Sequence, residues 1–571
     1  MKSLYIIIFL VLQVYSGFSQ GSWAPLNNQA PLKNKGVMLL LSDGTVMAKS
    51  GNSSNDSTSA NWIKLTPDQQ GSYLNGTWSL LEPMHHTRLY FSSQVLMDGR
   101  VYVAGGEYGT GRSSAEIYDP LKDAWTMLTS PGINVSDANS EILPDGRVLQ
   151  AIVGNNKTVI YDPKSNTFSA GPTPNKNMNE SSWVKLRDNS ILFVGMNSFS
   201  SLRYIPSSNK WVQDANVPVM LYDPYGSETG AGFLLPNGKA FFIGSTNVTA
   251  YYTPSGDSTM GVWEKGPNLP SGLGAPDAAA AMLVNGKILC ALSPIADSAN
   301  HFKKPTIFYE FDYLSNQFKQ ILAPDENSFM NIPCYVTNML DLPDGNVLYA
   351  SQGSMDYYVY RPEGSPLAQG KPVISQIVQT TCDSFFATGT LFNGISEGAS
   401  YGDDWQMNTN YPIIRLRSGS DVYYLRSYNW NSTGVQRWNL SDTAFFALPK
   451  GLPLSSFEIE VVANGNSSDP IPFQYIPCAQ IAEKGLLDNN HLFIYPNPSI
   501  IQTRLMFKLN ESGTFQIRII DMLGRLVQEE TGSGYEGNNS YVLNLRHIAR
   551  GEYVIILQTG SQLMKSKLIV N

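Results

Sequence analysis

Acidic side chains recur at one position in the repeats of this sequence. Two-residue turns, Asp-Gly or Asn-Gly except for one Asp-Asn, occur along residues 43–345, and the residues eight positions before three of them are Asp137, Glu180 and Asp277. Glu228 lies one step before the equivalent position of a fourth turn. If each turn joins two strands, these carboxylates stand at the ends of the first strands, around one axis. They could bind a cation or a sugar; the alternative is a set of solvated loop acids in a wide, wet channel.

Aromatic and basic side chains are expected around the same rim. The residue eight positions before Asp98-Gly99 is Tyr90, and the loops at that end also carry Arg88, Glu107, Tyr108, Arg112, Trp183, Tyr222, Tyr225 and Tyr335. Aromatic rings beside acids and amides suit carbohydrates, because sugar C–H faces stack on rings while the hydroxyls need hydrogen-bond partners. They suit a protein partner equally well. The predicted ligand-binding residues are Tyr90, Asp137, Glu180, Asp277, Glu228, Tyr335, Arg88, Glu107 and Arg112.

The elements that must position these residues form a repeat. An apolar strand, a two-residue turn and a second apolar strand recur seven times, with turns at Asp43-Gly44, Asp98-Gly99, Asp145-Gly146, Asp188-Asn189, Asn237-Gly238, Asn285-Gly286 and Asp344-Gly345. Asp-Gly and Asn-Gly tolerate positive φ at both positions, which a type I′ hairpin requires. The spacing runs from 43 residues (188 − 145) to 59 (344 − 285), which is the length of a propeller blade.

A Tyr-x-Pro turn and an aromatic residue complete most repeats. The aromatics are Trp78, Trp125, Phe168, Trp211, Trp263 and Phe318. Six of them serve seven hairpins, while Trp23 stands alone before the first hairpin. We therefore predict that the strand around Trp23 completes the last blade and closes the ring, which hides strand edges that would otherwise aggregate.

The repeats and the segment after them together resemble a known family. Gly105-Gly106 matches the double glycine of kelch repeats, and residues 372–477 contain seven or so short strands typical of an immunoglobulin-like sandwich. A kelch propeller over residues 20–366 followed by such a sandwich resembles galactose oxidase and its relatives, whose second module is called an early-set domain. The predicted fold class is all-β: a seven-bladed kelch β-propeller, an immunoglobulin-like (early-set) β-sandwich and a small C-terminal β-sandwich.

The resemblance implies a copper ion held by two tyrosines and two histidines, with one tyrosine crosslinked to a cysteine. Tyr335 and Tyr90 match the tyrosines, but Val336 and Trp430 stand where the histidines should be. The first cysteine is Cys290, so an early blade cannot provide the thiol. The histidines of the chain are His85, His86, His301, His491 and His547. Copper is therefore not expected, and no other cofactor is predicted.

The four cysteines favour structural roles. Cys382 and Cys478 flank the sandwich, and an exported protein meets an oxidising compartment, so a disulfide between them is one alternative and two reduced thiols the other. Cys290 and Cys334 lie in neighbouring blades and have the same two alternatives. No histidine or basic residue is near any of them in the sequence, as a nucleophile would require.

The N-terminus has the features of an export signal. Lys2 precedes an apolar run, Leu4–Tyr15, and small residues follow it. This pattern predicts a signal peptide over residues 1–19 that is cleaved before Gln20. The run is too short to span a membrane as a helix.

The last residues of the chain form a separate module with period-2 alternation, typical of a small antiparallel sandwich. Its motifs are Tyr495-Pro496-Asn497-Pro498, the turn Asp521-Met522-Leu523-Gly524-Arg525 and the tail Lys567-Leu568-Ile569-Val570. Residues 487–571 thereby resemble the C-terminal sorting domain of the type IX secretion system of Bacteroidetes. The resemblance implies the secretion machinery as a partner, and release or attachment at the cell surface.

Charge and composition narrow the function. The chain has 39 basic and 47 acidic residues, a net charge of −8, with no basic stripe, so a nucleic-acid partner is not expected. No later segment is long and apolar enough to span a membrane. We predict a secreted or cell-surface kelch-propeller protein that acts as a non-catalytic glycan- or protein-binding module. The alternative is a carbohydrate-active enzyme or a remodelled oxidase on the galactose oxidase scaffold.

Overall fold

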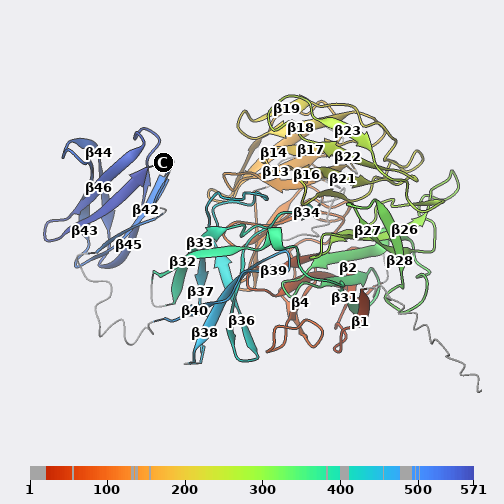
Figure 1. The fold of residues 1–571 in the computed structure, drawn as a ribbon, viewed down its shortest axis with the longest axis horizontal. Coiled ribbons are helices and arrows are strands. Elements are labelled where there is room, and N and C mark those ends of the chain that lie inside the picture. The colour runs from red at the N-terminus through yellow and green to blue at the C-terminus, as the bar shows by residue number, and fades with distance from the viewer. Residues whose placement is uncertain are drawn as a thin grey trace, which may run out of the picture. The chain divides into compact units, whose positions relative to one another are not determined.

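The chain forms two compact units built almost entirely of β-strands (Figure 1). The computed structural model describes residues 21–53, 57–129, 134–135, 139–153, 156–179, 181–380, 383–398, 410–453, 455–475, 491–495, 497–499 and 502–570. The units are Met1–Gln474 and Tyr475–Asn571. Within the described ranges, no helix is long and apolar enough to span a membrane. The predicted signal peptide, residues 1–19, lies outside the described residues.

The described part of the first unit contains seven antiparallel sheets in sequence order, five of four strands and two of five, consistent with a β-propeller. The first three consist of β2 (Lys33–Leu40), β3 (Val46–Gly51), β4 (Trp62–Thr66) and β5 (Thr77–Leu81); β7 (Ser92–Val95), β8 (Val101–Ala104), β10 (Ala115–Asp119) and β11 (Ala124–Met127); and β12 (Ser140–Ile142), β13 (Val148–Ile152), β14 (Lys157–Asp162) and β15 (Thr167–Ala170). Two short strands, β6 (Arg88–Leu89) and β9 (Tyr108–Gly109), pair with each other. In the chain, β6 comes directly before β7 and β9 directly after β8 of the second sheet.

The next three sheets repeat this pattern. They consist of β16 (Ser182–Lys185), β17 (Ile191–Val194), β18 (Ser201–Ile205) and β19 (Lys210–Gln213); β20 (Gly232–Leu234), β21 (Ala240–Ile243), β22 (Thr249–Thr253) and β23 (Val262–Lys265); and β25 (Ala280–Met282), β26 (Ile288–Pro294), β27 (Ile307–Asp312) and β28 (Gln317–Ile321), with β24 (Leu273–Gly274) also on β26. The seventh comprises β29 (Thr337–Asp341), β30 (Val347–Ser351), β31 (Tyr357–Arg361) and β1 (Ser22–Pro25), preceded by the 3₁₀ turn η1 (Cys334–Val336) and followed by η2 (Ala368–Gly370).

The first strand of the chain completes the last sheet, as the sequence predicted. β1 pairs antiparallel with β31, with Trp23 opposite Tyr360. The Trp23 ring lies 4.7 Å from the Tyr360 ring and 5.3 Å from that of Tyr349, between centroids. Its Nε1 donates a hydrogen bond to the Leu322 carbonyl at 2.8 Å. The two ends of the repeat region are therefore joined by both backbone pairing and aromatic packing.

The seven turns lie where the sequence places them but are of another type. In each, only the second residue has positive φ, such as 77° at Gly44 and 64° at Asn189. Its N–H donates to a leucine carbonyl three residues earlier, as from Gly146 to Leu143 at 2.9 Å. This is a type I turn followed by a left-handed residue, so the prediction of type I′ hairpins is wrong. The left-handed position still explains why glycine or asparagine occupies it.

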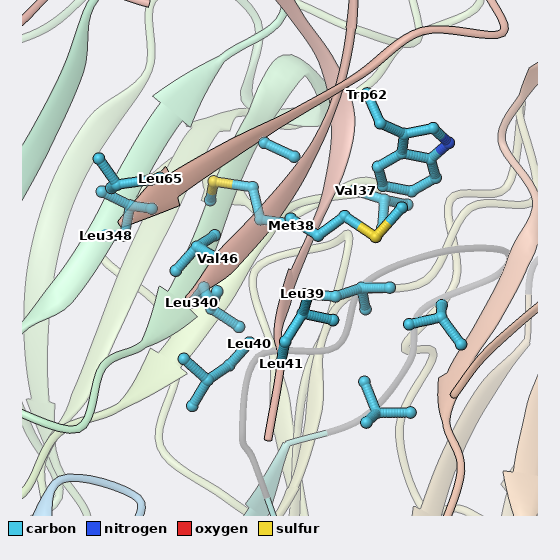
Figure 2. Packing of buried hydrophobic residues seen from close by; sticks show 14 of the residues in the cluster. Val37, Met38, Leu39, Leu40, Leu41, Val46, Trp62, Leu65, Leu340 and Leu348 are labelled. Carbon is cyan, nitrogen blue, oxygen red and sulfur yellow. The ribbon is translucent and has the colours of Figure 1, made fainter. Parts of the chain in front are cut away.

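Apolar side chains on both faces of the inner strands hold the sheets together. Along β2, every residue from Val37 to Leu40 is buried, so this strand is a continuous apolar run without polar alternation. Figure 2 shows this strand beside Leu340 and Leu348 of the last sheet, and all belong to one buried cluster. The first and seventh sheets thus share a core.

A region of eight hydrogen-bonded strands, the one that the sequence predicted as a sandwich and that is called the sandwich below, follows the seven sheets within the first unit. Its strands are β32 (Val373–Gln379), β33 (Ser384–Thr390), β35 (Ile413–Ser418), β36 (Asp421–Tyr428), β37 (Asp442–Ala447), β38 (Phe457–Ala463), β39 (Asn466–Ser467) and β40 (Ile471–Phe473). The connection between β33 and β35 contains β34 (Glu397–Gly398), which pairs antiparallel with β20 and places Glu397 opposite Leu234. Gln436 Nε2 also donates to the Leu235 carbonyl at 2.7 Å. The sandwich is therefore hydrogen-bonded to the fifth sheet.

The second unit has two sheets around one apolar core. One contains β41 (Leu492–Tyr495), β42 (Gln502–Leu509) and β45 (Gly537–Asn544), and the other β43 (Gly513–Asp521), β44 (Leu526–Gly534), β46 (Gly551–Gln558) and β47 (Leu563–Val570). Alternate residues of β43, including Phe515, Ile517 and Ile519, are buried in this core. The observed alternation agrees with the period-2 pattern of the sequence.

Candidate functional site

The predicted site residues lie in the loops opposite the turns. In each sheet the turn joins strands one and two, so the connections between strands two and three, and between successive sheets, fall at the other end. Tyr90, Glu228, Asp277 and Tyr335 precede the first strand of a sheet, and Glu107 and Arg112 follow the second. Asp137 and Glu180 lie outside the described residues.

Tyr90 connects the second and seventh sheets. Its hydroxyl lies 3.4 Å from the Gln352 side-chain amide, and its ring stands edge-on to the Tyr108 ring at 6.3 Å between centroids. Tyr90 has a φ of 51°, in the left-handed region that bulky residues rarely occupy. Such strain persists only where the surroundings impose it, and it concentrates at binding sites. Tyr108 is 49% exposed, so the aromatic pair reaches solvent.

Two further predicted residues lie on the same loops. The Glu107 N–H donates to the Tyr90 carbonyl at 2.9 Å, which fixes the loop that carries Tyr108. Arg112 is exposed, and its carbonyl accepts a hydrogen bond from the Val135 N–H at 3.0 Å. The structure therefore brings Tyr90 and Glu107 together and leaves the Arg112 side chain accessible to a ligand.

Arg88 is a buried structural residue in this fold. Its side chain is fully buried, and the guanidinium pairs with buried Glu116 at 3.0 Å. It also donates to the carbonyls of Gly105 at 2.5 Å, Gly111 at 2.6 Å and Ser114 at 3.0 Å. Because these bonds engage the guanidinium inside the protein, Arg88 supports the loop that carries Glu107 and does not face the rim.

A second group gathers between the fifth and seventh sheets. The Asp277 N–H donates to the Thr229 carbonyl at 2.9 Å, next to Glu228, and Asp277 has a φ of 53°. The Tyr335 ring, in η1, lies 4.6 Å from the Phe302 ring. Both Asp277 and Tyr335 border Cys334, since Asp277 is close enough to raise the pKa of its thiol. The predicted residues thus form two groups, one around Tyr90 and one around Asp277.

Sequence reasoning missed several rim residues and misplaced one. Phe199, which was missed, is 45% exposed and packs edge-on against the predicted rim residue Tyr222 at 6.2 Å; Tyr225, also predicted, is 51% exposed. Phe302, also missed, is the one Phe, Tyr or Trp residue on the β26–β27 connection, so the sequence offered no pattern that singles it out. Trp183, expected at the rim, is instead buried against Trp211 at 5.6 Å.

The described cysteines are separate buried thiols. Cys290 and Cys334 are both free and fully buried, so the pairing alternative does not hold for them. The Cys334 thiol lies 3.1 Å from Ser293 Oγ, and burial raises its pKa to about 12. A thiol held neutral in this way is a poor nucleophile. Cys382 and Cys478 lie outside the described residues.

The side chains at the two histidine positions of the oxidase resemblance do not fit copper. Val336 is buried and has no donor atom, and the buried Trp430 ring stacks on Tyr411 at 5.0 Å. An indole N–H only donates hydrogen bonds, so it cannot replace an imidazole ligand. Among the described residues, no group of three or more His, Cys, Asp or Glu side chains is arranged to hold a metal ion.

Two family models match parts of the chain. Residues 493–571 match the secretion system C-terminal sorting domain, and residues 89–132 match the kelch motif. The sorting domain supports secretion or attachment at the cell surface and implies an interaction with the type IX secretion machinery. No curated protein matches.

Several solved structures are similar at low identity. A fungal alcohol oxidase of the AA5 family, in complex with copper, is 14% identical with a TM-score of 0.47, and the match covers 80% of this chain and 100% of the oxidase. A streptogramin B lyase is 14% identical with a TM-score of 0.41, covering 60% of this chain and 98% of the lyase. A catalytically inactive virginiamycin B lyase from Staphylococcus aureus with quinupristin is 13% identical with a TM-score of 0.43, covering 60% and 100%. These similarities carry no inference about activity.

Proposed function

We propose that this protein is an exported, non-catalytic glycan-binding module, with a protein ligand as the second candidate. In this proposal a signal peptide covers residues 1–19, a seven-bladed kelch propeller residues 20–366, an early-set immunoglobulin-like sandwich residues 372–477 and a type IX sorting domain residues 487–571. The observation that carries the proposal is the set of exposed aromatic rings on the loops opposite the turns, Tyr108, Phe199 and Tyr225.

The residues around these rings favour a carbohydrate ligand. Tyr90 and Glu107 lie on the loops that carry or contact Tyr108, and Arg112 is exposed nearby in the sequence. In the second group, Asp277 is hydrogen-bonded through its N–H to Thr229, the neighbour of Glu228, and the Tyr335 ring packs on Phe302. A sugar needs both kinds of surface, since its C–H faces stack on rings and its hydroxyls bind polar groups.

We expect Tyr108→Ala and Tyr225→Ala each to weaken glycan binding by about tenfold, because each removes one exposed stacking surface. The measurement is a glycan array on the purified full chain, followed by calorimetric titration of the best ligand. Tyr535→Ala, an 81% exposed tyrosine in the second unit, is the matched control and should leave the affinity unchanged. Array binding that is insensitive to both rim variants, or no glycan bound at all, contradicts the glycan proposal.

We also propose that the protein is not a copper-radical oxidase. With Val336 and Trp430 at the histidine positions, copper would depend on phenolates, whose ordinary pKa of about 10 makes them poor ligands at neutral pH. The expected result is no peroxide from primary alcohols or sugars after loading with copper. Peroxide release that Tyr335→Phe abolishes would restore the oxidase alternative.

A further inference from the structure

A small, partly open cavity lies where β34 meets the sheets of the repeat region. It has a volume of about 30 Å³ and is bordered by β12, β16 and β34. Its charged lining residues are Glu141, Lys185 and Glu397. β34 is the segment of the sandwich that pairs with β20, and Figure 1 labels it next to β16. With Gln94 and Val95 of β7 also in its lining, the cavity is formed jointly by the second, third and fourth sheets and the segments that carry β34 and Thr433.

The charges around the cavity do not balance. Lys185 Nζ lies 2.7 Å from Glu141 Oε1 and 3.2 Å from Glu397 Oε1, so one ammonium serves two carboxylates. With all three groups ionised the sum is −2 + 1 = −1. Glu397 is 5% exposed, and its second oxygen, Oε2, is buried without a hydrogen-bond partner among the described residues. A buried carboxylate oxygen without a partner is unfavourable, so the cavity lacks one positive or hydrogen-bond-donating group.

The neutral side chains of the lining also present acceptors. Gln94 donates its amide hydrogens to the backbone carbonyl and hydroxyl of Ser140, and Asn410 donates to the carbonyls of Asn393 and Ser396. The remaining polar atom of each amide is its oxygen. The Tyr411 hydroxyl donates to the Leu40 carbonyl. Apart from the Lys185 ammonium and the Thr433 hydroxyl, which accepts from Lys185 Nζ at 3.5 Å and keeps its own O–H to donate, the polar side chains of the lining present oxygen acceptors.

We propose that this cavity binds one monovalent cation, such as sodium, through Glu397 Oε2 and neighbouring oxygens. Its volume suits an occupant of the size of one or two water molecules. Oxygen ligands suit hard cations. A single positive charge neutralises the net charge of the cluster, whereas a divalent ion would overcompensate beside the ammonium of Lys185.

A proton on Glu397 competes with this cation. Burial raises the pKa of Glu397 to about 8, with Glu141 adding to the rise and Lys185 opposing it. These are the charged groups that line the cavity. Because the ionised form binds the cation, binding strengthens as the pH rises toward and above that value. Each pH unit below it reduces the ionised fraction about tenfold.

The test compares sodium chloride with N-methylglucamine chloride at equal ionic strength, using thermal unfolding of the full chain. At about pH 9, sodium should raise the Tm saturably by about 1–2 °C, since a ligand of the native state alone stabilises that state. At about pH 6 the half-saturating sodium concentration should be about 100-fold higher. Broadening of the ²³Na resonance by the wild-type protein, reversed by potassium, gives a measurement that needs no variant.

Two variants locate the effect. Glu397→Gln keeps the shape of the side chain and should abolish the sodium response. Glu264→Gln removes an exposed carboxylate that pairs with Lys239 at 2.8 Å on the outer surface, and should leave the response intact. Three outcomes would overturn the proposal. The Tm could rise with calcium but with neither sodium nor potassium, it could rise with sodium equally in Glu397→Gln, or it could be independent of the cation.

Discussion

Replacing Arg88 by methionine is expected to lower the free energy of unfolding of the first unit by about 3–5 kcal/mol. Methionine fills similar space but removes the buried guanidinium from Glu116, which keeps only the His85 side chain and the His85 and His86 N–H groups as partners, and breaking one side of a buried pair has a cost of this size. The carbonyls of Gly105 and Gly111 lose their donor as well. Chemical denaturation followed by tryptophan fluorescence measures the change.

The matched control is Arg112→Met. Arg112 lies on the β9–β10 connection, near the loop that Arg88 supports, but is exposed, and substitutions at exposed positions change stability by less than about 0.5 kcal/mol. The two variants separate stability from binding, because Arg112 is available to a ligand and Arg88 is not. If Arg88→Met were as stable as the wild type while losing ligand binding, the sequence prediction of Arg88 as a ligand-binding residue would be correct.

Trp23→Ala is expected to destabilise the first unit by about 3–5 kcal/mol, the usual effect of removing a packed tryptophan. The ring touches Phe308, Tyr349 and Tyr360, and its Nε1 hydrogen bond to Leu322 is lost with it. The same denaturation experiment measures this change, with limited proteolysis reporting release of β1.

Trp23→Phe is the conservative comparison. It keeps an aromatic ring against Tyr360 and loses the hydrogen bond, so we expect a loss of about 1–2 kcal/mol. Equal stability of Trp23→Ala and the wild type would show that the pairing of β1 with β31 contributes little to the closed ring.

The repeat architecture was predictable because its signals are local. Hairpin turns and aromatic positions recur within each repeat, and the unpaired Trp23 predicted the strand that the structure places opposite Tyr360. The turn type was predicted wrongly, as type I′, although the sequence contained a signal for type I. In Leu143-Pro144-Asp145-Gly146 the proline at the second position is typical of a type I turn.

The site was predictable only in part, because burial and pairing depend on residues far apart in the chain. Counting back from the turns placed Tyr90 and Asp277 at strand ends, where both adopt left-handed conformations. Nothing near Arg88 in the sequence showed that Glu116 would neutralise it inside a sheet. Likewise, the contact of Lys185 with Glu397 joins residues more than 200 positions apart through a strand of the sandwich.

The position of β1 in the chain has a consequence for the order of folding. β1 is the first strand described and β31, its partner, ends at Arg361, so the seventh sheet contains a contact between opposite ends of the repeat region. Contacts of such long sequence separation form slowly, because the loop must close before they contribute stability. The six preceding sheets consist mainly of strands that are neighbours in the sequence, so each can form before the rest of the chain has folded. Pairing of β1 with β31 is then the last and slowest step, and a chain interrupted before β31 would expose the edge of β1 that pairs with β31 to other chains.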